Sequence, residues 1–334
     1  MKLSRFVRLA VKSFLFISLL FTPSVAAEQD QSSLSGQAST AVGRPRIGLA
    51  LGGGGTRGIA HLAVIRELEK NHIPIDCIAG TSMGAIVGGL YCAGLNTDEI
   101  EDFFRNKSMV RSYDTVPIFL RVTLVPIFAI PHVVFHNYDG LYRGHKFAKY
   151  INERVASECR RIEDLKIPFC AVASNLLDGQ PAALTTGNLG RALQASSAIP
   201  ELRKPVIYDG KLLVDGGVVA NLPVDQCRAM GADIVIAVNV DEQLVELKDN
   251  HFRKIGTVPY RCLNMHLSSI DAPQVSKADL CIHPDVAGIQ LLSRSLKDMD
   301  LAMAAGQKAT VQAIPAIKDL INKKLAKNGR ELEE

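Results

Sequence analysis

The sequence lacks the features that define several common classes of protein. None of its seven cysteines forms a CxxC pair, so the usual spacing of a zinc or dithiol site is missing. No uninterrupted apolar run reaches the roughly 20 residues that a membrane-spanning helix needs. No internal repeat is present, and 47% apolar with 22% charged residues is ordinary for a globular protein. The 334 residues are enough for one large domain or two small ones.

The first 27 residues are typical of a secretory signal peptide. A basic stretch precedes an apolar run at 14–21, and Pro23 is followed by small residues. We expect an exported protein, periplasmic or secreted, with residues 28–45 as a flexible linker rich in Gln, Ser, Ala and Gly. An uncleaved anchor is the alternative, which leaves membrane association open.

Little net charge remains once this segment is set aside. The whole chain has a formal charge of +4, and residues 1–27 carry four Lys or Arg and no acidic residue. The remaining chain is therefore neutral. A broad basic surface for nucleic acid has no support in the composition.

Short apolar strands alternate with helices through the middle of the chain. Residues 47–51 and 75–79 are strand candidates, and 56–71 and 83–93 have helical patterns. This succession predicts an α/β fold with a parallel sheet. Further elements are expected farther along, as strands at 169–173, 206–208, 211–214, 234–240 and 280–283 and as helices at about 288–313 and 316–328.

A glycine-rich block follows the first strand. Glycines at 52–55 and 58 allow several backbone N–H groups to converge at the start of a helix, where they bind a phosphate or stabilise an oxyanion. The block also fits the dinucleotide pattern GxGxxG, which on its own is a weak signal. No carboxylate ends the next strand to hold a ribose, and Arg57-Gly58-Ile59 is not a P-loop ending.

The segment Gly80-Thr81-Ser82-Met83-Gly84 has the GxSxG pattern of a nucleophile elbow. It lies between a predicted strand and a predicted helix, where a sharp turn would lift the Ser82 hydroxyl above the helix N-terminus. The alternative is a serine that only caps the helix.

Asp215 is the candidate partner of Ser82. It follows the strand predicted at 211–214 and precedes Gly216 and Gly217. Ligand sites of such sheets gather at the carboxyl ends of the strands. A carboxylate there is therefore within reach of the serine, although an ordinary Asp-Gly turn would give the same pattern.

Taken together, these blocks resemble the patatin-like phospholipase family. The resemblance covers residues 46–313 and includes the glycine block, the GxSxG elbow, the segment 195–200 (ASSAIP) and Asp215-Gly216-Gly217, with Asn221 and Pro223 behind it. It implies a three-layer α/β/α sandwich with a mainly parallel central sheet. Residues 314–334 are expected to form a C-terminal helix and tail.

The resemblance also implies the chemistry. Ser82 and Asp215 would form a catalytic dyad, with Gly53, Gly54 and Gly55 as the oxyanion hole. The reaction would be ester cleavage in membrane phospholipids or lysophospholipids through an acyl-enzyme, with no metal or organic cofactor. A non-catalytic lipid-binding protein and a soluble carboxylesterase are the alternatives.

Three further points stay open at the level of sequence. Arg57 either binds a lipid phosphate or braces the glycine block, and the second is favoured. His251, His266 or His283 would be the third member if the site were a triad, with His283 the best placed. The apolar stretch 116–135, interrupted by three prolines, is either a buried excursion or a surface for peripheral membrane contact. The oligomeric state is not predicted.

Overall fold

The computed structural model describes residues 44–106, 112–113, 142–254 and 256–331. The expected signal peptide, almost all of the linker and the stretch 116–135 lie outside these residues. Residues 43–243 and 267–334 belong to one unit, and residues 244–266 belong to another. The second of these contains the short 3-10 helix η6 (Asp249–Arg253) and the first turns of α11 (Thr257–Lys277).

An eight-stranded mixed sheet forms the centre of the larger unit. Its order is β5-β6-β3-β2-β1-β7-β8, and β4 pairs with β3 beside this path. The pairings among β3, β2, β1, β7 and β8 are parallel, and those of β3 with β4, β3 with β6 and β5 with β6 are antiparallel. The strands are β1 (Ile47–Leu51), β2 (Cys77–Thr81), β3 (Phe169–Asn175), β4 (Pro181–Leu184), β5 (Val206–Tyr208), β6 (Lys211–Asp215), β7 (Ile234–Val238) and β8 (Leu280–Ile282).

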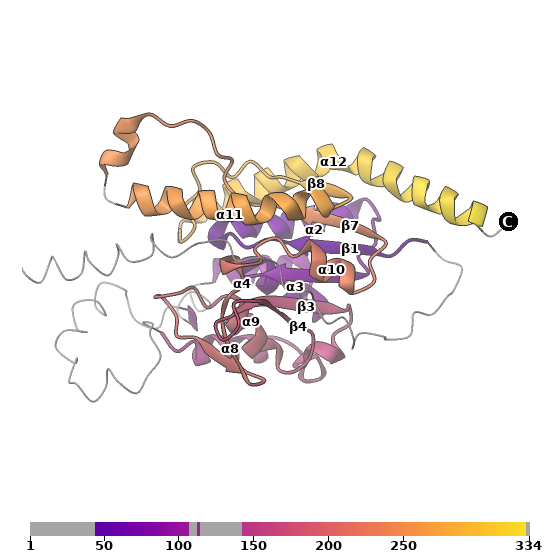
Figure 1. Cartoon of the computed structure of the whole chain (residues 1–334). Coiled ribbons are helices and arrows are strands. Elements are labelled where there is room, and N and C mark those ends of the chain that lie inside the picture. Colours follow the sequence, from indigo (N-terminus) through magenta and orange to yellow (C-terminus); the bar gives the residue numbers. More distant parts are fainter. Residues whose placement is uncertain (1–43, 107–111, 114–141, 255, 332–334) are drawn as a thin grey trace, which may run out of the picture. The chain divides into compact units, whose positions relative to one another are not determined.

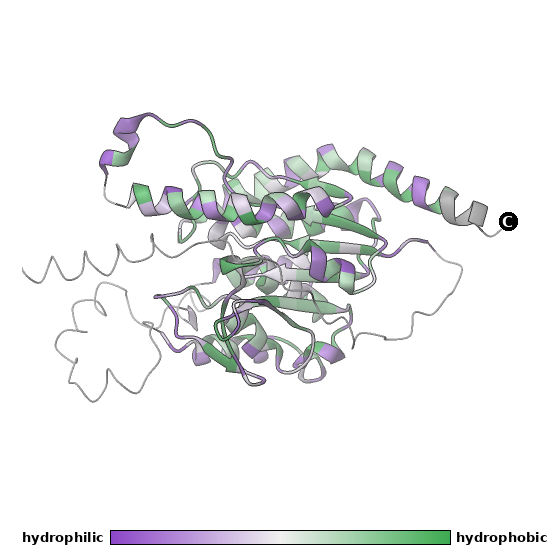
Figure 2. Ribbon diagram, viewed as in Figure 1, coloured by the Kyte–Doolittle hydropathy of each residue, from purple (hydrophilic) through white to green (hydrophobic). Residues whose placement is uncertain are grey.

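The central strands are buried on both faces, which explains their nearly continuous apolar sequence (Figure 2). Successive side chains of a strand point to opposite faces of the sheet. Thus Ile47, Leu49 and Leu51 of β1 belong to one apolar cluster, while Ala50 belongs to a second cluster. The residues of β7 divide between the two clusters in the same alternating way.

Helices cover both faces, which gives the three-layer α/β/α sandwich that the sequence predicts. The larger cluster includes residues of the helices α2, α3, α8, α9 and α12, whereas α10 supplies Val224 and Cys227 to the smaller one. Figure 1 shows these elements. Their bounds are α2 (Ala60–Lys70), α3 (Met83–Cys92), α4 (Thr97–Arg105), α8 (His145–Asn152), α9 (Leu189–Ser196), α10 (Val224–Ala229) and α12 (Leu296–Glu331), with short 3-10 helices η2 (Gly55–Ile59), η3 (Ser157–Cys159), η4 (Ile162–Asp164) and η5 (Gly216–Val218).

The hairpin between β5 and β6 follows from its turn sequence. Asp209 and Gly210 have φ angles of 48° and 72°, the left-handed conformation that a two-residue type I′ turn requires. The sequence predicts this turn and both of its strands. It gives no signal for β4, a four-residue strand that begins with a proline.

The C-terminal helices differ most from the prediction. A single helix, α12, replaces the two helices predicted at 288–313 and 316–328, and it continues through Pro315. Proline removes one backbone hydrogen bond from a helix interior. Here the flanking Ile314 and Ile317 are buried in the core, and this packing offsets the loss. Gly306 allows close packing, because a Cβ there would lie 2.4 Å from the carbonyl oxygen of Ala60 in α2.

All seven cysteines lie in the described part of the chain, and none is paired with another. Five of them are buried, which agrees with their positions in apolar runs. Among the described residues, no helix combines the length and the apolar character needed to cross a bilayer.

Candidate active site

Ser82 occupies the turn between β2 and α3. It is one of four non-glycine residues of the described chain with a positive φ, and its φ of 52° and ψ of −116° are the strained geometry of a nucleophile elbow. A residue held in such a region costs about 1–3 kcal/mol, so the surrounding packing must enforce the turn. The backbone geometry agrees with the elbow that the GxSxG pattern predicts.

The glycines of the elbow are required for close contacts. A Cβ at Gly84 would lie 2.3 Å from the carbonyl oxygen of Leu51, at the end of β1. A Cβ at Gly80 would lie 2.6 Å from the backbone of Gly84 and Ala85. Only glycine therefore lets α3 begin this close to the ends of the two strands.

Asp215 meets the serine from β6. Its Oδ2 atom accepts a hydrogen bond of 2.7 Å from Ser82 Oγ, although the two residues are far apart in sequence. The other carboxylate oxygen accepts a bond of 2.8 Å from the N–H of Gly217, which fixes the plane of the carboxyl group. β6 pairs with β3 and β3 with β2, so the sheet itself brings the two side chains together.

The environment of Asp215 makes it a stronger base than a free carboxylate. Its burial raises its pKa to about 6, and the hydrogen bonds from Ser82 and Gly217 act in the opposite direction. Desolvation favours the neutral form of a carboxyl group. Asp215 is therefore mostly ionised at pH 7, yet binds a proton more readily than an exposed aspartate does.

Ser196 holds the backbone of the elbow in place. Its hydroxyl oxygen accepts a 3.0 Å hydrogen bond from the N–H of Ser82 and donates one of 2.6 Å to the carbonyl oxygen of Val172. Ser196 ends α9 and is fully buried. It lies within the segment 195–200 noted above, but no sequence pattern predicts that it contacts the backbone of the nucleophile.

The glycine block lies directly beside Ser82. A Cβ at Gly53 would lie 3.3 Å from Ser82 Cβ. The N–H of Gly53 donates a 3.2 Å hydrogen bond to the carbonyl oxygen of Asn221. Within the described part of the chain, the N–H groups of Gly54 and Gly55 donate to no protein group. The amide of Gly53 thus has a partner within the protein, whereas those of Gly54 and Gly55 have none in the described chain.

His61 supports the glycine block from the first turn of α2. Its Nε2 atom lies 2.7 Å from the carbonyl oxygen of Gly52, and the side chain is completely buried. Burial lowers the pKa of His61 to about 4, so the ring is neutral at pH 7 and Nε2 carries the proton that it donates. The Gly52–Gly53 peptide is therefore held at its carbonyl by His61 and at its N–H by Asn221.

The guanidinium group of Arg57 binds other groups of the protein. Its Nε donates a 2.7 Å hydrogen bond to the carbonyl oxygen of Ile289, and one terminal nitrogen pairs with Glu242 at 2.6 Å. The residue is only 1% exposed. This geometry favours the loop-bracing role over contact with a lipid phosphate.

His283, the best placed of the histidines considered for a triad, has a partner other than Asp215. His283 uses Nε2 to contact the carbonyl oxygen of Asp241 at 3.0 Å, and Ser82 donates to Asp215 instead. His251 and His266 belong to residues 244–266. No cluster of three His, Cys, Asp or Glu side chains suited to a metal ion occurs among the described residues.

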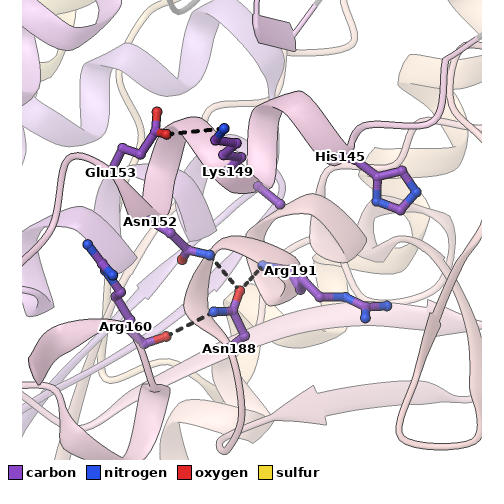
Figure 3. A pocket seen from close by; sticks show the side chains of 8 residues that line it. His145, Lys149, Asn152, Glu153, Arg160, Asn188 and Arg191 are labelled. Carbon is purple, nitrogen blue, oxygen red and sulfur yellow. Dashed lines mark hydrogen bonds and ion pairs between the residues drawn. The ribbon is translucent and has the colours of Figure 1, made fainter. Parts of the chain in front are cut away.

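A separate cleft of about 620 Å³ lies between α8 and α9. In Figure 3, Asn188 hydrogen-bonds to Asn152 and to the backbone of Arg160 and Arg191. Three cationic side chains, those of Lys149, Arg160 and Arg191, also line it. We refer to it as the α8–α9 cleft. It contains no candidate nucleophile.

The model of the family described as patatin-like phospholipase matches residues 49–228, which is more than half of the chain. The chain belongs to the patatin-like phospholipase family. The matched range includes the glycine block, Ser82 and Asp215, so the patatin-like region contains the whole candidate site.

Individual relatives agree with this membership. The chain is 37% identical over 194 residues to Lysophospholipase NTE1 of Mycosarcoma maydis, covering 58% of this chain and 10% of that protein. It is 37% identical over 197 residues to an uncharacterized NTE family protein of Mycobacterium tuberculosis, covering 59% of this chain and 49% of that protein. The match thus spans about half of the mycobacterial protein and a tenth of the fungal one.

Among solved structures, VipD from Legionella pneumophila aligns with a TM-score of 0.46 and 14% identity. That alignment covers 82% of this chain and 67% of VipD.

Proposed function

We propose that this patatin-like protein is a serine lipid acyl hydrolase, of the phospholipase A or lysophospholipase type, in which Ser82 and Asp215 act as a catalytic dyad. The observation that carries the proposal is the 2.7 Å hydrogen bond from Ser82 Oγ to Asp215 Oδ2, made at a strained elbow. A serine becomes a nucleophile when an adjacent base takes its proton.

In the first step, Ser82 Oγ attacks the carbonyl carbon of an ester while Asp215 accepts the hydroxyl proton. The C–O bond to the alcohol then breaks, and the proton on Asp215 passes to the leaving oxygen. A water molecule next attacks the acyl-enzyme with Asp215 again as base, releasing the fatty acid and restoring the Ser82 hydroxyl. The raised pKa of Asp215, about 6, suits a group that must accept and return this proton near neutral pH.

The amides of Gly54 and Gly55 are the proposed donors to the negative charge that develops on the ester oxygen. They have no partner in the described protein, and η2 begins at Gly55. The amide of Gly53 would join them only by weakening its 3.2 Å bond to Asn221. Each such donor contributes roughly 3–4 kcal/mol to the transition state in serine hydrolases.

Phospholipids and lysophospholipids are the proposed substrates, because the family description and the name of the fungal relative point to them. Export, with residues 1–27 as its signal, and peripheral membrane contact through residues 116–135 are further proposals from the sequence alone.

The test is product analysis on a mixture of phospholipids and lysophospholipids, comparing wild type with Ser82→Ala. The proposal expects free fatty acid and the matching deacylated lipid from wild type only. Equal release by Ser82→Ala would overturn the dyad. Cleavage of short soluble esters without any lipid product would instead identify a carboxylesterase.

A further inference from the structure

Two buried carboxyl groups lie behind the glycine block. Asp271 comes from α11 within the larger unit, and Asp241 follows β7. They are 1% and 6% exposed, respectively. Within the described residues, Asp241 Oδ2 has no hydrogen-bond donor. The Nδ2 atom of Asn221 lies 2.7 Å from Asp271 Oδ2 and 3.4 Å from Asp241 Oδ1, so the two carboxyl groups are close neighbours. Buried charges of equal sign at this distance repel strongly, so the pair demands a physical explanation.

The pair is best described as sharing one proton. Two carboxyl groups can hydrogen-bond to each other only if one of them is protonated. Desolvation raises the pKa of both, and for Asp271 the neighbouring Asp241 raises it further, to about 9. At pH 7 the proton therefore resides mainly on Asp271.

Asn221 connects this pair to the rest of the site. Its Nδ2 atom donates a 2.7 Å hydrogen bond to Asp271 Oδ2 and lies 3.4 Å from Asp241 Oδ1. The N–H of the next residue, Leu222, donates to Asp271 Oδ1 at 2.9 Å. Because the amide nitrogen faces the carboxyl groups, the amide oxygen must point the other way.

The opposite side of Asn221 faces the reaction centre. Its main-chain carbonyl accepts the hydrogen bond of Gly53, and its Oδ1 lies 2.4 Å from where a Gly53 Cβ would be. That same position is 3.3 Å from Ser82 Cβ. A Cβ at Gly217, whose amide binds Asp215, would lie 3.2 Å from Asn221 Oδ1. Asn221 thus touches both loops that flank the dyad.

We propose that Asp271 is a positioning residue that holds Asn221, and thereby the glycine block, against Ser82. The proposal rests on the proposed hydrolase function and goes beyond it, because neither carboxyl group contacts the dyad. Loss of the shared proton would place two carboxylates side by side, and their repulsion would displace Asp271 together with the Asn221 amide bound to it. The oxyanion donors would then lose their alignment while the dyad itself stayed intact.

Other charged groups surround the pair and must be considered in any dependence on pH. Arg57 and His283 face Asp241, and Cys281 faces Asp271. Burial raises the pKa of Cys281 to about 11, so its thiol ionises well after Asp271 does. Asp271 is therefore the group of this cluster that loses a proton near pH 9.

The test is the dependence of kcat and KM on pH between 5 and 10 with a 4-methylumbelliferyl fatty-acyl ester. Wild type is compared with Asp271→Ala and Asp271→Asn, and Ser82→Ala gives the spontaneous rate at each pH. Asp225→Asn is the matched control, since Asp225 is exposed and its carboxylate binds Gln274 and Lys277 of the helix that carries Asp271, rather than the Asn221 amide. Thermal unfolding of each variant reports on its fold.

We expect kcat of Asp271→Ala to fall roughly 10- to 100-fold with little change in KM, the effect of a misaligned reaction centre. Asp271→Asn should recover part of this loss, because its amide oxygen still accepts one of the two hydrogen bonds that Asp271 accepts from Asn221 and Leu222. Wild type and Asp225→Asn should lose kcat above pH 9, and Asp271→Asn should not. This change in the alkaline limb distinguishes positioning from simple support of the fold.

The positioning role is overturned if Asp271→Asn declines above pH 9 as wild type does, or if a folded Asp271→Ala keeps the kcat of wild type. If Asp271→Ala fails to fold, the profile of Asp271→Asn alone decides. Failure of the proposed function would appear elsewhere, as hydrolysis by Ser82→Ala.

Discussion

The two ends of α9 contrast two kinds of polar region. At its C-terminal end, Ser196 binds the backbone of Ser82 in a buried centre where strands, a helix and a glycine loop converge. At its N-terminal end, Asn188 caps the helix and lines the α8–α9 cleft, where Lys149 and Arg191 remain exposed. The cleft is the more visible cavity, whereas the buried centre contains the strained backbone and the shifted pKa values.

The comparison shows that the hydrogen bonding and pKa values of the residues, rather than the volume of a cavity, identify the candidate site. In the cleft, the amides at the start of α9 are already satisfied by Asn188, Asn152 and Arg160, so none is directed at a ligand. In the buried centre, burial raises the pKa of Asp215, and two glycine amides have no partner in the described chain. Such perturbed groups are typical of functional sites.

The largest effect should come from removing the charge of the proposed base. Asp215→Asn keeps the shape of the side chain but cannot accept the Ser82 proton, so kcat should fall by roughly 10⁴-fold, as in other hydrolases that lose the carboxylate of the site. In wild type, kcat should fall about tenfold per pH unit below 6, because protonation of Asp215 removes the base. Steady-state kinetics from pH 4 to 8 test both expectations. A substantial rate in Asp215→Asn would mean that Asp215 is not the base, and the buried centre would no longer be distinguished from the α8–α9 cleft as the catalytic site.

A smaller effect is expected from crowding the glycine block. In Gly53→Ala, the new methyl group would lie 2.4 Å from Asn221 Oδ1 and 3.3 Å from Ser82 Cβ, so the loop must move. We expect kcat to fall roughly 10²- to 10³-fold, the usual effect of a lost oxyanion donor. Gly179→Ala is the control for backbone strain without crowding, because its φ is 72° and nothing lies within 4 Å of a Cβ there; its kcat should stay near that of wild type. Wild-type kinetics in Gly53→Ala would mean that this loop does not form the oxyanion hole.

The smallest effect should come from the α8–α9 cleft. Lys149→Ala combined with Arg160→Ala removes two exposed cations without touching the buried centre. Surface substitutions of this kind usually change energies by no more than about 0.5 kcal/mol, so kcat/KM on a soluble ester should change by less than about twofold. A tenfold loss of kcat/KM would mean that the α8–α9 cleft takes part in the reaction.

Much of the centre could be predicted because its signals are local. The strand before Ser82, the elbow and the helix after it are adjacent in sequence, and the Asp209-Gly210 turn marks the strand that carries Asp215. The pairing of β3 with both β2 and β6 then follows from the fold. Whether Ser82 and Asp215 touch is a question of tertiary structure that a pattern only suggests.

The residues that support the site could not be predicted, because their importance depends on contacts between segments that are far apart in sequence. Asp271 belongs to α11, where no motif distinguishes it from other helical aspartates, and its significance arises only from burial against Asp241. The sequence does not distinguish His61 from the other residues on the buried face of its helix. The sequence predicts two helices separated near Pro315, because a proline usually ends or kinks a helix. In the structure, burial of the residues around Pro315 keeps α12 continuous.

The most direct test of the central claim is labelling with a fluorophosphonate, which reacts with activated serines, followed by peptide mass spectrometry. If Ser82 and Asp215 form a catalytic dyad, wild type should give a single adduct on Ser82. The adduct should form much more slowly in Asp215→Asn, and none should form at this position in Ser82→Ala. Hydrolysis that continues while Ser82 remains unmodified, or an adduct formed equally fast without the Asp215 carboxylate, would contradict the dyad.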